Sequence, residues 1–489
     1  MLKKAIANLM NWVDDRSGLI SSMKPMMGHH VPRDAKWWYV FGSATLMFFT
    51  IQILTGICLA LVYVPDASGA WESLIYINER VPFGWWLRAI HGWSANAMVM
   101  MMVLHMTQVF LHGTYKFPRE MTWCVGVLLF ICTLALAFTG EVMRWDTDAY
   151  WGVGIGAAIM GRIPFVGAWL THLVLGGPII GGETLSRFFA LHVFVLPGVT
   201  IGLIGLHLML VLKNGVSEMP RPGAVVDKRN YREAYEARMK SKGEPFFPNA
   251  AQRDMVFIGI MLLVLMGLAA WFGPFGPNEP PVPTDINVNP RPDFAFLWIF
   301  AVLALLTPQV EDFLLITAMP VALIFLLAIP FISNQGERAP SKRPLSVLVV
   351  VLIFTGLAVL SVLGVQSPWS PHMTAWSKDW TPPNLLEGRS SLEMTGAIVL
   401  QNSQCRNCHS LEGVGGKRGP DLTDVATRLS HDQIVRQVQQ GGGNMPAYGR
   451  SLTAAETQAV AAFLGTMHPA NERGAFIPGA EIEELKKLR

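Results

Sequence analysis

Two cysteines and a histidine stand together near the C-terminus of the chain, in the stretch "QCRNCHS". Cys405 and Cys408 are separated by two residues, and His409 follows directly. This is the pattern for covalent attachment of a c-type haem, in which the thiols add to the haem and the histidine binds its iron. A zinc site would need further ligands at suitable spacing, and a thioredoxin-like pair would need a βαβ context. Neither is present around the motif, so it predicts a haem c.

A methionine downstream of the motif is placed to complete the coordination of this iron. Met445 lies in "NMPAY", where a class I cytochrome c has its sixth ligand, and ligation by histidine and methionine raises the potential of a haem. Helical patterns cover 392–402 before the motif and 453–467 after it. We therefore expect a small α-helical cytochrome c domain over 391–470 and a charged tail over 471–489. Alternative sixth ligands are Met394, Met467, His431 and His468.

Four more histidines lie in two apolar segments and form two matched pairs. His91 and His105 are 14 residues apart, and His192 and His207 are 15 apart. At about 3.6 residues per turn both intervals are close to four turns, so the members of each pair share a helix face about 21 Å apart. Ionisable groups inside a membrane are costly and usually functional. Two such helices facing each other would make two stacked sites in which neutral imidazoles bind a haem iron from both sides.

Glycines and arginines near these histidines support this interpretation. Two glycine pairs on neighbouring apolar segments repeat the interval of 14 residues. Glycine allows a flat, bulky group to approach a helix backbone; close packing of two helices is the alternative. The shared interval favours a porphyrin. The glycines are Gly42 with Gly56 and Gly126 with Gly140.

Two arginines precede the first histidine of each pair. Arg88 lies three residues before His91, and Arg187 lies five before His192. Both could neutralise haem propionates, although arginines at the ends of membrane helices also extend towards the interface.

The rest of the chain has the composition of a membrane protein. Of its 489 residues 51% are hydrophobic and only 15% are charged, against about 25% in soluble domains. A membrane-spanning helix needs about 20 mostly apolar residues. Seven segments qualify, and a shorter run over 294–307 predicts a loop helix. The seven segments are 37–63, 86–111, 121–140, 188–212, 254–273, 312–333 and 344–365.

The connections between these segments differ in charge and predict an orientation. The N-terminal segment and the loops before the third, after the fourth and after the sixth span are rich in Lys and Arg. With seven alternating spans all four fall on one side, which the positive-inside rule makes cytoplasmic. Everything after residue 365 then lies outside, where c-type haems are attached. We therefore expect a multi-pass protein of a bacterial cytoplasmic membrane, with a cytoplasmic N-terminus and a periplasmic cytochrome c domain.

Three stretches of the chain resemble the cytochrome b family of quinol:cytochrome c oxidoreductases. They are "RAIHGWSANAMVMMMVLHM", "FTGEVMRWDTDAYWG" and "SRFFALHVFVLPGVTIGLIGLHLMLVLKNG". The 14/15 histidine interval is similar to that of the b6 branch. From "FFPNAAQRDMVFIGI" onwards the chain resembles the smaller partner of b6, here joined to it. The resemblance covers roughly residues 1–365.

The resemblance implies an all-α fold and a domain order. A four-helix di-haem domain would cover 1–215, and a three-helix domain with an outer quinol-site loop would cover 216–365. A Pro- and Trp-rich linker, 366–390, would lead to the cytochrome c domain. By resemblance His91 and His192 bind a low-potential haem near the outside, and His105 and His207 bind a high-potential haem near the cytoplasm. Val40 stands where the b6 branch attaches a third haem to cysteine, so no such covalent haem is expected.

The resemblance also places an outer quinol site, with departures. Where the family has Pro-Glu-Trp-Tyr, this chain has Pro292, Asp293, Phe294 and Ala295. By resemblance Asp293 accepts a proton from quinol. Aspartate before an apolar helical run is also a good helix N-cap. Ala295 removes a hydroxyl and much volume, which reshapes the pocket. The residues Glu141 and Arg144 depart from the family as well, the latter at a position where proline is usual.

These features together predict a fused cytochrome b and cytochrome c subunit of a respiratory or photosynthetic bc-type complex. It would oxidise quinol at an outer site, reduce a quinone at an inner site and couple both to proton translocation. The sequence has no Cys/His cluster for an iron–sulfur centre, so a Rieske protein is an expected partner, with a homodimer, a further cytochrome c acceptor and no nucleic acid. One alternative is a di-haem anchor of a dehydrogenase without a Rieske partner. Another is a transport or structural membrane protein that carries a sensing cytochrome.

Overall fold

The fold comes from a computed structural model. It describes residues 2–18, 21, 27–177, 180–223, 225–281, 290–306, 308–366, 379–416, 419–441, 445, 448–449 and 452–469. The predicted tail over 471–489 and most of the predicted linker therefore lie outside the described residues.

Seven long apolar helices dominate the described part of the chain, which confirms the predicted count of spans. Three of them combine an α-helix with a π-helical turn, and the histidine at 192 lies in such a turn. The seven are α3 (Phe41–Ala60), α5 (Gly84–Leu111), α6 (Glu120–Val142), α9 (Gly182–Ala190) with η2 (Leu191–Val195) and α10 (Leu196–Asn214), η3 (Phe246–Ala250) with α12 (Ala251–Phe272), α14 (Pro308–Phe313) with η4 (Leu314–Ala318) and α15 (Met319–Ile332), and α16 (Pro344–Val365).

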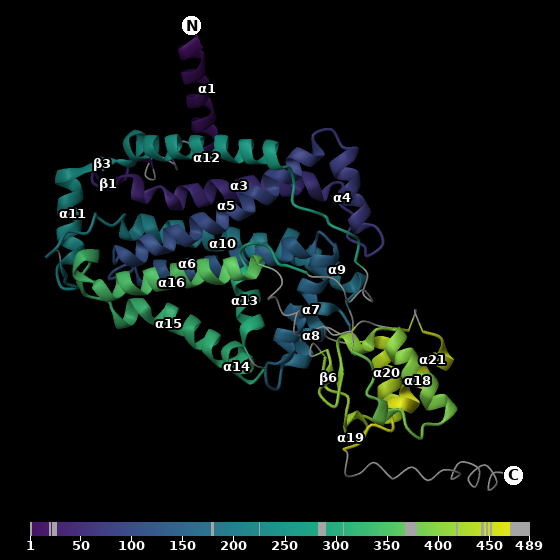
Figure 1. Ribbon diagram of the computed structural model, residues 1–489. Helices are drawn as coiled ribbons and strands as arrows, with labels where there is room; N and C mark the ends of the chain where they lie inside the picture. The colour runs from purple at the N-terminus through teal and green to yellow at the C-terminus, as the bar shows by residue number, and fades with distance from the viewer. Residues whose placement is uncertain are drawn as a thin grey trace.

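These helices run beside one another as a bundle (Figure 1). The closest pairs are α3 with α5 and α6 with α10, while α12 packs on α5 and α15 on α6. Ala44, Ala89 and Ala269 are fully buried where three of these helices meet. Small residues let helix backbones approach closely in a membrane, where burial of apolar surface does not itself drive association. The bundle therefore holds its helices by close packing.

One end of the bundle carries short helices. They are α4 (Ala70–Glu79), α7 (Thr147–Gly161), α8 (Gly167–Leu175) and α13 (Leu297–Leu305), of which α7 and α8 pack on one another (Figure 1). The nine-residue α13 packs along α16 and occupies the run for which the sequence predicts a loop helix. These elements close the bundle on the side that faces the C-terminal domain.

The other end gathers three of the four basic connections. Lys116 donates to the carbonyl oxygens of Ser333 and Gln335 at 2.9 and 2.6 Å, and Arg119 donates to that of Gly215 at 2.9 Å. Helix C-termini leave carbonyls without partners and carry partial negative charge, which cations satisfy. Two short antiparallel pairs and one helix complete this end. They are β1 (His30–Pro32) with β3 (Gly243–Pro245), β2 (Val225–Val226) with β4 (Gly336–Glu337), and α11 (Tyr231–Lys242).

The N-terminal helix stands apart from the bundle. α1 (Leu2–Ser17) projects sideways from it, and its described side chains are mostly exposed (Figure 1). Ile6, Leu9 and Trp12 are exposed among charged residues, which is typical of an amphipathic helix that lies on a membrane surface.

The C-terminal domain is a separate small helical unit with its own core. Its main helices are α18 (Ser391–Asn402), α20 (His431–Gln440) and α21 (Ala454–Leu464), with the short elements η7 (Cys405–Asn407), β5 (Ser410–Leu411), β6 (Val414–Gly415) and α19 (Val425–Arg428). Each main helix begins with a capping box, in which a Ser or Thr side chain and a Glu or Gln side chain satisfy the first backbone N–H groups. Leu400, Leu411 and Phe463 are buried at its centre.

Candidate functional site

The histidines His91 and His192 face each other across the bundle. Their ring centroids are 6.3 Å apart and the ring planes are inclined by 73°. Two imidazoles on one metal ion, each bonded at about 2 Å, hold their nitrogens about 4 Å apart. Because the ring centres lie behind those nitrogens, a centroid separation of 6.3 Å suits a shared iron. We refer to this as the outer pair.

A threonine hydroxyl contacts each ring of the outer pair. Oγ1 of Thr55 lies 2.8 Å from Nδ1 of His91, and Oγ1 of Thr139 lies 3.0 Å from Nδ1 of His192. Both hydroxyl hydrogens are donated to helix carbonyls one turn earlier. The hydroxyls must therefore accept from Nδ1–H, which leaves Nε2 with a free lone pair for a metal. This arrangement fits the neutral tautomer that iron ligation needs.

The inner pair, His105 and His207, lies on the same two helices. Their Nδ1 atoms are buried and make no hydrogen bond of acceptable geometry to any residue in the described part of the chain. The two pairs therefore share their spacing but not their polar surroundings.

Each of the four predicted glycines lies against one of the four histidines. A Cβ placed on Gly56 or Gly140 would lie 3.3 or 2.8 Å from the ring of an outer histidine, and one on Gly42 or Gly126 would lie 3.2 or 3.5 Å from an inner one. A side chain at these positions would fill the space beside the imidazoles. The lack of side chains therefore suits a flat porphyrin, and the residues present fit a haem at both levels. The ligand assignment itself stays a prediction.

The two arginines predicted near propionates bond to protein groups here. Arg88 is buried and donates to Oδ1 of Asn78 at 2.8 Å and to the carbonyl oxygens of Phe275 and Gly276. Arg187 donates to carbonyl oxygens of α8. Arg88 nevertheless lines the same cavity as the outer pair.

This cavity has a volume of about 510 Å³ and opens beside the outer pair. Its walls come from α3, α5, α6 and the start of α10, with Phe275 and Ala295 on its rim. Most of the lining side chains are apolar, and the charged ones gather at one end. A largely apolar cavity with a few convergent polar groups is the usual form of a small-molecule site.

Four charged residues form a network at that end of the cavity. Arg144 lies 2.8 Å from Asp293, 3.4 Å from Asp146 and 3.8 Å from Glu141. Burial alone would lower the pKa of Arg144, but the neighbouring carboxylates, Asp293 first, raise it above its usual value. The guanidinium therefore stays charged and holds Asp293 at the cavity.

This network bears on one of the two roles considered for Asp293, that of a helix cap. Helix α13 begins after Phe296, and no side chain caps it. The carboxylate of Asp293 instead bonds to Arg144, with 37% of the side chain exposed. Its neighbours Pro292 and Phe294 continue the loop, while Ala295 lines the cavity with Asp293. The helix-cap interpretation is thus not what the structure shows.

In the C-terminal domain the motif residues are arranged around a buried histidine. Nδ1 of His409 lies 2.8 Å from the carbonyl oxygen of Pro420, to which it can only donate, so Nε2 is again free. Burial lowers the pKa of His409, which keeps the ring neutral. A Cβ on Gly419 would collide with this ring. Burial also raises the pKa of the Cys405 thiol to about 12, which argues against a reactive thiolate.

The methionine predicted as sixth ligand packs on the same core as Cys405. Nε2 of Gln437 donates to Sδ of Met445 at 3.6 Å, at the end of α20. Of the alternatives, Met467 is fully buried inside the helical core, and His431 bonds to Gln458 on the surface. These surroundings favour Met445, whose role stays a prediction.

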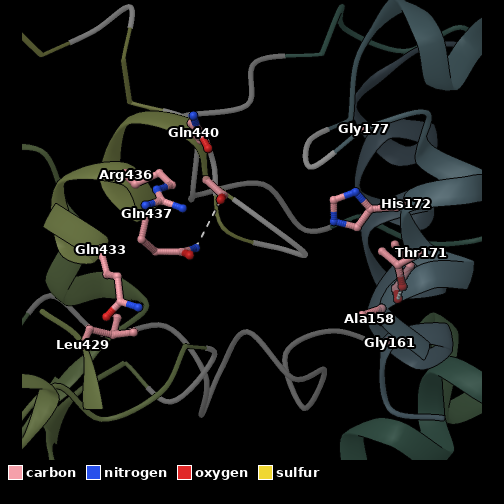
Figure 2. A pocket seen from close by; sticks show the side chains of 13 residues that line it. Ala158, Gly161, Thr171, His172, Gly177, Leu429, Gln433, Arg436, Gln437 and Gln440 are labelled. Carbon is pink, nitrogen blue, oxygen red and sulfur yellow. Dashed lines mark hydrogen bonds between the residues drawn. The ribbon is translucent and has the colours of Figure 1, made fainter. Parts of the chain in front are cut away.

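A second cleft, of about 500 Å³, lies between the C-terminal domain and the short helices α7 and α8 at the end of the bundle. His172 and Thr171 of α8 stand on one side of it, and glutamines of α20 stand on the other (Figure 2). Gln437, whose side chain also donates to the carbonyl of Gly441 at 3.2 Å, points from α20 into this space. The cleft therefore begins next to Met445.

Sequence reasoning missed the two threonines, although a signal was present. Thr55 directly precedes Gly56, and Thr139 directly precedes Gly140. Neither inner glycine follows a threonine. The repeated Thr-Gly dipeptide thus marks the outer pair.

Comparison with known proteins agrees with this geometry. Residues 26–215 match the family described as cytochrome b/b6/petB, residues 281–379 match cytochrome b(C-terminal)/b6/petD, and residues 393–464 match cytochrome C oxidase, cbb3-type, subunit III. The chain belongs to the cytochrome b/b6 family and carries a cytochrome c domain fused behind it. It is a haem-containing, integral membrane component of a bc-type electron-transport complex.

Individual relatives cover different parts of the chain. The menaquinol:cytochrome c reductase cytochrome b subunit of Geobacillus thermodenitrificans is 39% identical over 217 residues, which are 43% of this chain and 97% of that protein. The cytochrome bc complex cytochrome b subunit of Chlorobaculum thiosulfatiphilum is 32% identical over 71% of this chain and 78% of its own. A solved chain of a hyperthermophilic respiratory Complex III aligns with a TM-score of 0.63 at 28% identity, covering 74% of this chain and 92% of that one.

Proposed function

We propose that this chain oxidises membrane quinol at the charged end of the cavity that the outer histidine pair lines, while the haem would take the part between the two rings and the outer glycines. The observation that carries the proposal is the composition of that one cavity. It brings together His91 and His192, apolar walls, and the ion pair of Arg144 with Asp293. A quinol ring needs apolar walls for its tail and face, a base for its protons and a nearby electron acceptor.

In this proposal the membrane histidines hold two non-covalent haem b groups, as outer and inner pairs. Cys405, Cys408, His409 and Met445 hold one covalent haem c. When bound, each haem supplies an iron that takes up and releases one electron. The chain itself presents Nε2 of each histidine to the iron. Its glycines leave space beside the histidine rings, the haem slots, and the bundle excludes water from the outer and the inner pair.

Asp293 acts as the proton acceptor for quinol. Its carboxylate lines the cavity and is 37% exposed, so it can accept a proton inside and release it outside. The bond from Arg144 orients it. A positioned carboxylate of this kind typically contributes about 10²–10⁴-fold to the rate of a proton-coupled step.

The partners and orientation of the chain follow from the same proposal. Of the two quinol electrons, one goes to a Rieske iron–sulfur partner and on to the fused cytochrome c domain. The other crosses inward to a quinone. The clustered basic connections of the bundle face the cytoplasm, and the cytochrome c domain faces the periplasm. A homodimer, a further cytochrome c acceptor and the domain boundaries given above belong to the proposal as well.

Purification of the complex from its native membrane tests this function. We expect a Rieske protein among the subunits, two haem b for each haem c by pyridine haemochrome assay, and quinol-dependent reduction of an added cytochrome c. Asp293→Asn should lower kcat for quinol by about 10²-fold or more, while Asp148→Asn, outside the cavity, should not. A complex that lacks a Rieske protein and still reduces cytochrome c would favour the dehydrogenase anchor. A chain without haem b would favour the sensor.

A further inference from the structure

The carboxylate of Glu141, at the end of α6, is buried with little to offset a negative charge. The residue is 4% exposed, and Nη2 of Arg144 is 3.8 Å from its Oε1. The backbone N–H of Asp293 donates to Oε1 at 3.1 Å. Oε2 is buried without a hydrogen-bond partner in the described part of the chain. From α5, Arg88 lines the same cavity, but its guanidinium is taken up by Asn78 and backbone carbonyls.

Three carboxylates share the single guanidinium of Arg144. Asp293 at 2.8 Å and Asp146 at 3.4 Å are both nearer to it than Glu141. Asp146 is further stabilised because it accepts backbone N–H bonds from Ala149 and Asn278. Three negative charges around one cation, two of them buried, are costly, because like charges at this distance oppose one another's ionisation. Glu141 has the poorest partners and is therefore the carboxyl group best suited to bind a proton.

Glu141 also stands where a proton from quinol would arrive. It follows Gly140, which lies against the ring of His192, and its side chain lines the cavity beside the outer pair. Asp293 contacts Glu141 through its backbone and is the more exposed of the two carboxylates. The shared guanidinium of Arg144 and the N–H of Asp293 hold the two carboxyl groups near each other, one buried and the other partly exposed.

We propose that Glu141 is a second proton acceptor of the quinol cavity and passes its proton to Asp293. This inference rests on the proposed function of the cavity. In the step, an O–H bond of quinol breaks and an O–H bond forms at the Glu141 carboxylate. The electron left on the quinol oxygen goes to a one-electron acceptor, either a ferric haem or an oxidised iron–sulfur cluster. Glu141 then gives the proton to Asp293, whose exposed side chain releases it to water.

Isosteric variants in the full complex test the proposal. Glu141→Gln keeps size and polarity but cannot take up a proton. We expect kcat for quinol oxidation to fall at least about tenfold, with little change in KM. This is less than the about 10²–10⁴-fold of a sole proton-transfer group, because Asp293 remains. Glu141→Asp should recover part of the rate. Glu120→Gln, at the opposite end of the same helix and outside the cavity, is the matched control and should behave as wild type.

Each outcome separates the two proposals. If Glu141→Gln turns over as fast as wild type while Asp293→Asn is slow, the second acceptor is wrong and the quinol site stands. If the wild-type complex does not oxidise quinol at all, the function itself is wrong. Retention of the haem b spectrum in Glu141→Gln shows that the bundle has assembled.

A measurement on the wild-type complex covers the case in which Glu141→Gln does not assemble. Redox-induced infrared difference spectra report carboxyl groups that gain or lose a proton. With ¹³C-labelled glutamate, the protonated-carboxyl signal that accompanies quinol oxidation should shift. A signal that is unaffected by this label would overturn the assignment to Glu141.

Discussion

The outer and inner histidine pairs are built from the same helices at nearly the same spacing, yet their surroundings differ. In the outer pair, threonine hydroxyls fix both rings, and a cavity with four charged residues lies alongside. In the inner pair, both Nδ1 atoms are buried, and neither has a hydrogen-bond partner of good geometry among the described residues. The shared spacing thus defines two equivalent slots. The difference in chemistry comes from residues outside the repeated pattern.

The difference has a physical consequence for the ligands. An acceptor for Nδ1–H fixes the orientation of a metal-bound imidazole and makes it more basic. The protein therefore pre-orients His91 and His192 with side-chain hydroxyls, whereas among the described residues no side chain does so for His105 and His207, and the backbone of Thr122 is the polar group near the ring of His207.

The largest effect should come from removing a ligand. His192→Leu should abolish binding of the outer haem and quinol oxidation, and His207→Leu should remove only the inner haem. Each variant should therefore lose about half of the b-type absorbance of the dithionite-reduced complex. His172→Leu, in the exposed cleft, is the control and should keep full absorbance. Full b-type absorbance in His192→Leu would rule out the outer site.

A smaller effect is expected from filling the slots. A Cβ at Gly140 would lie 2.8 Å from the ring of His192, whereas one at Gly126 would lie 3.5 Å from that of His207. Overpacking of this kind costs about 1–3 kcal/mol. Gly140→Ala should therefore lower the ratio of haem b to haem c, and Gly126→Ala should leave it near that of wild type. Equal losses in both variants would mean that the slots are equally tight.

The smallest effect should come from the threonines. Thr139→Val removes the hydroxyl acceptor for Nδ1–H of His192 and leaves only the backbone of Leu136 as a partner among the described residues, so the imidazole becomes a poorer electron donor. The outer haem should stay bound with its midpoint potential raised by less than about 59 mV, a tenfold change in equilibrium constant. Thr133→Val, on the same helix, removes a hydroxyl bonded only to the carbonyl of Leu129 and should change neither potential. If the midpoint potential of the inner haem shifted instead, the assignment of His192 to the outer haem would be contradicted.

Much of the bundle could be predicted from the sequence because its signals are periodic. Apolar runs of sufficient length predicted all seven spans. The nearly equal intervals, 14 and 15 residues for the histidines and 14 for the glycines, predicted matched faces, which the structure brings together one to one. The charged network could not be predicted in this way. Arg144 and Asp293 are 149 residues apart, and their contact depends on how the loop before α13 folds back over α6. A repeated interval in the sequence places a residue on a helix face, but it does not predict which loop side chain will cover that face.

The joining of both parts in one polypeptide has a kinetic consequence. The C-terminal domain lies beside α8 at the end of the bundle, across a cleft that starts next to Met445. A tether turns an encounter between two modules into a unimolecular event, with an effective concentration that reaches the millimolar range for short flexible connections. Diluting the complex into a larger area of lipid should therefore not slow the arrival of this domain at the bundle, whereas it would slow that of a freely diffusing carrier.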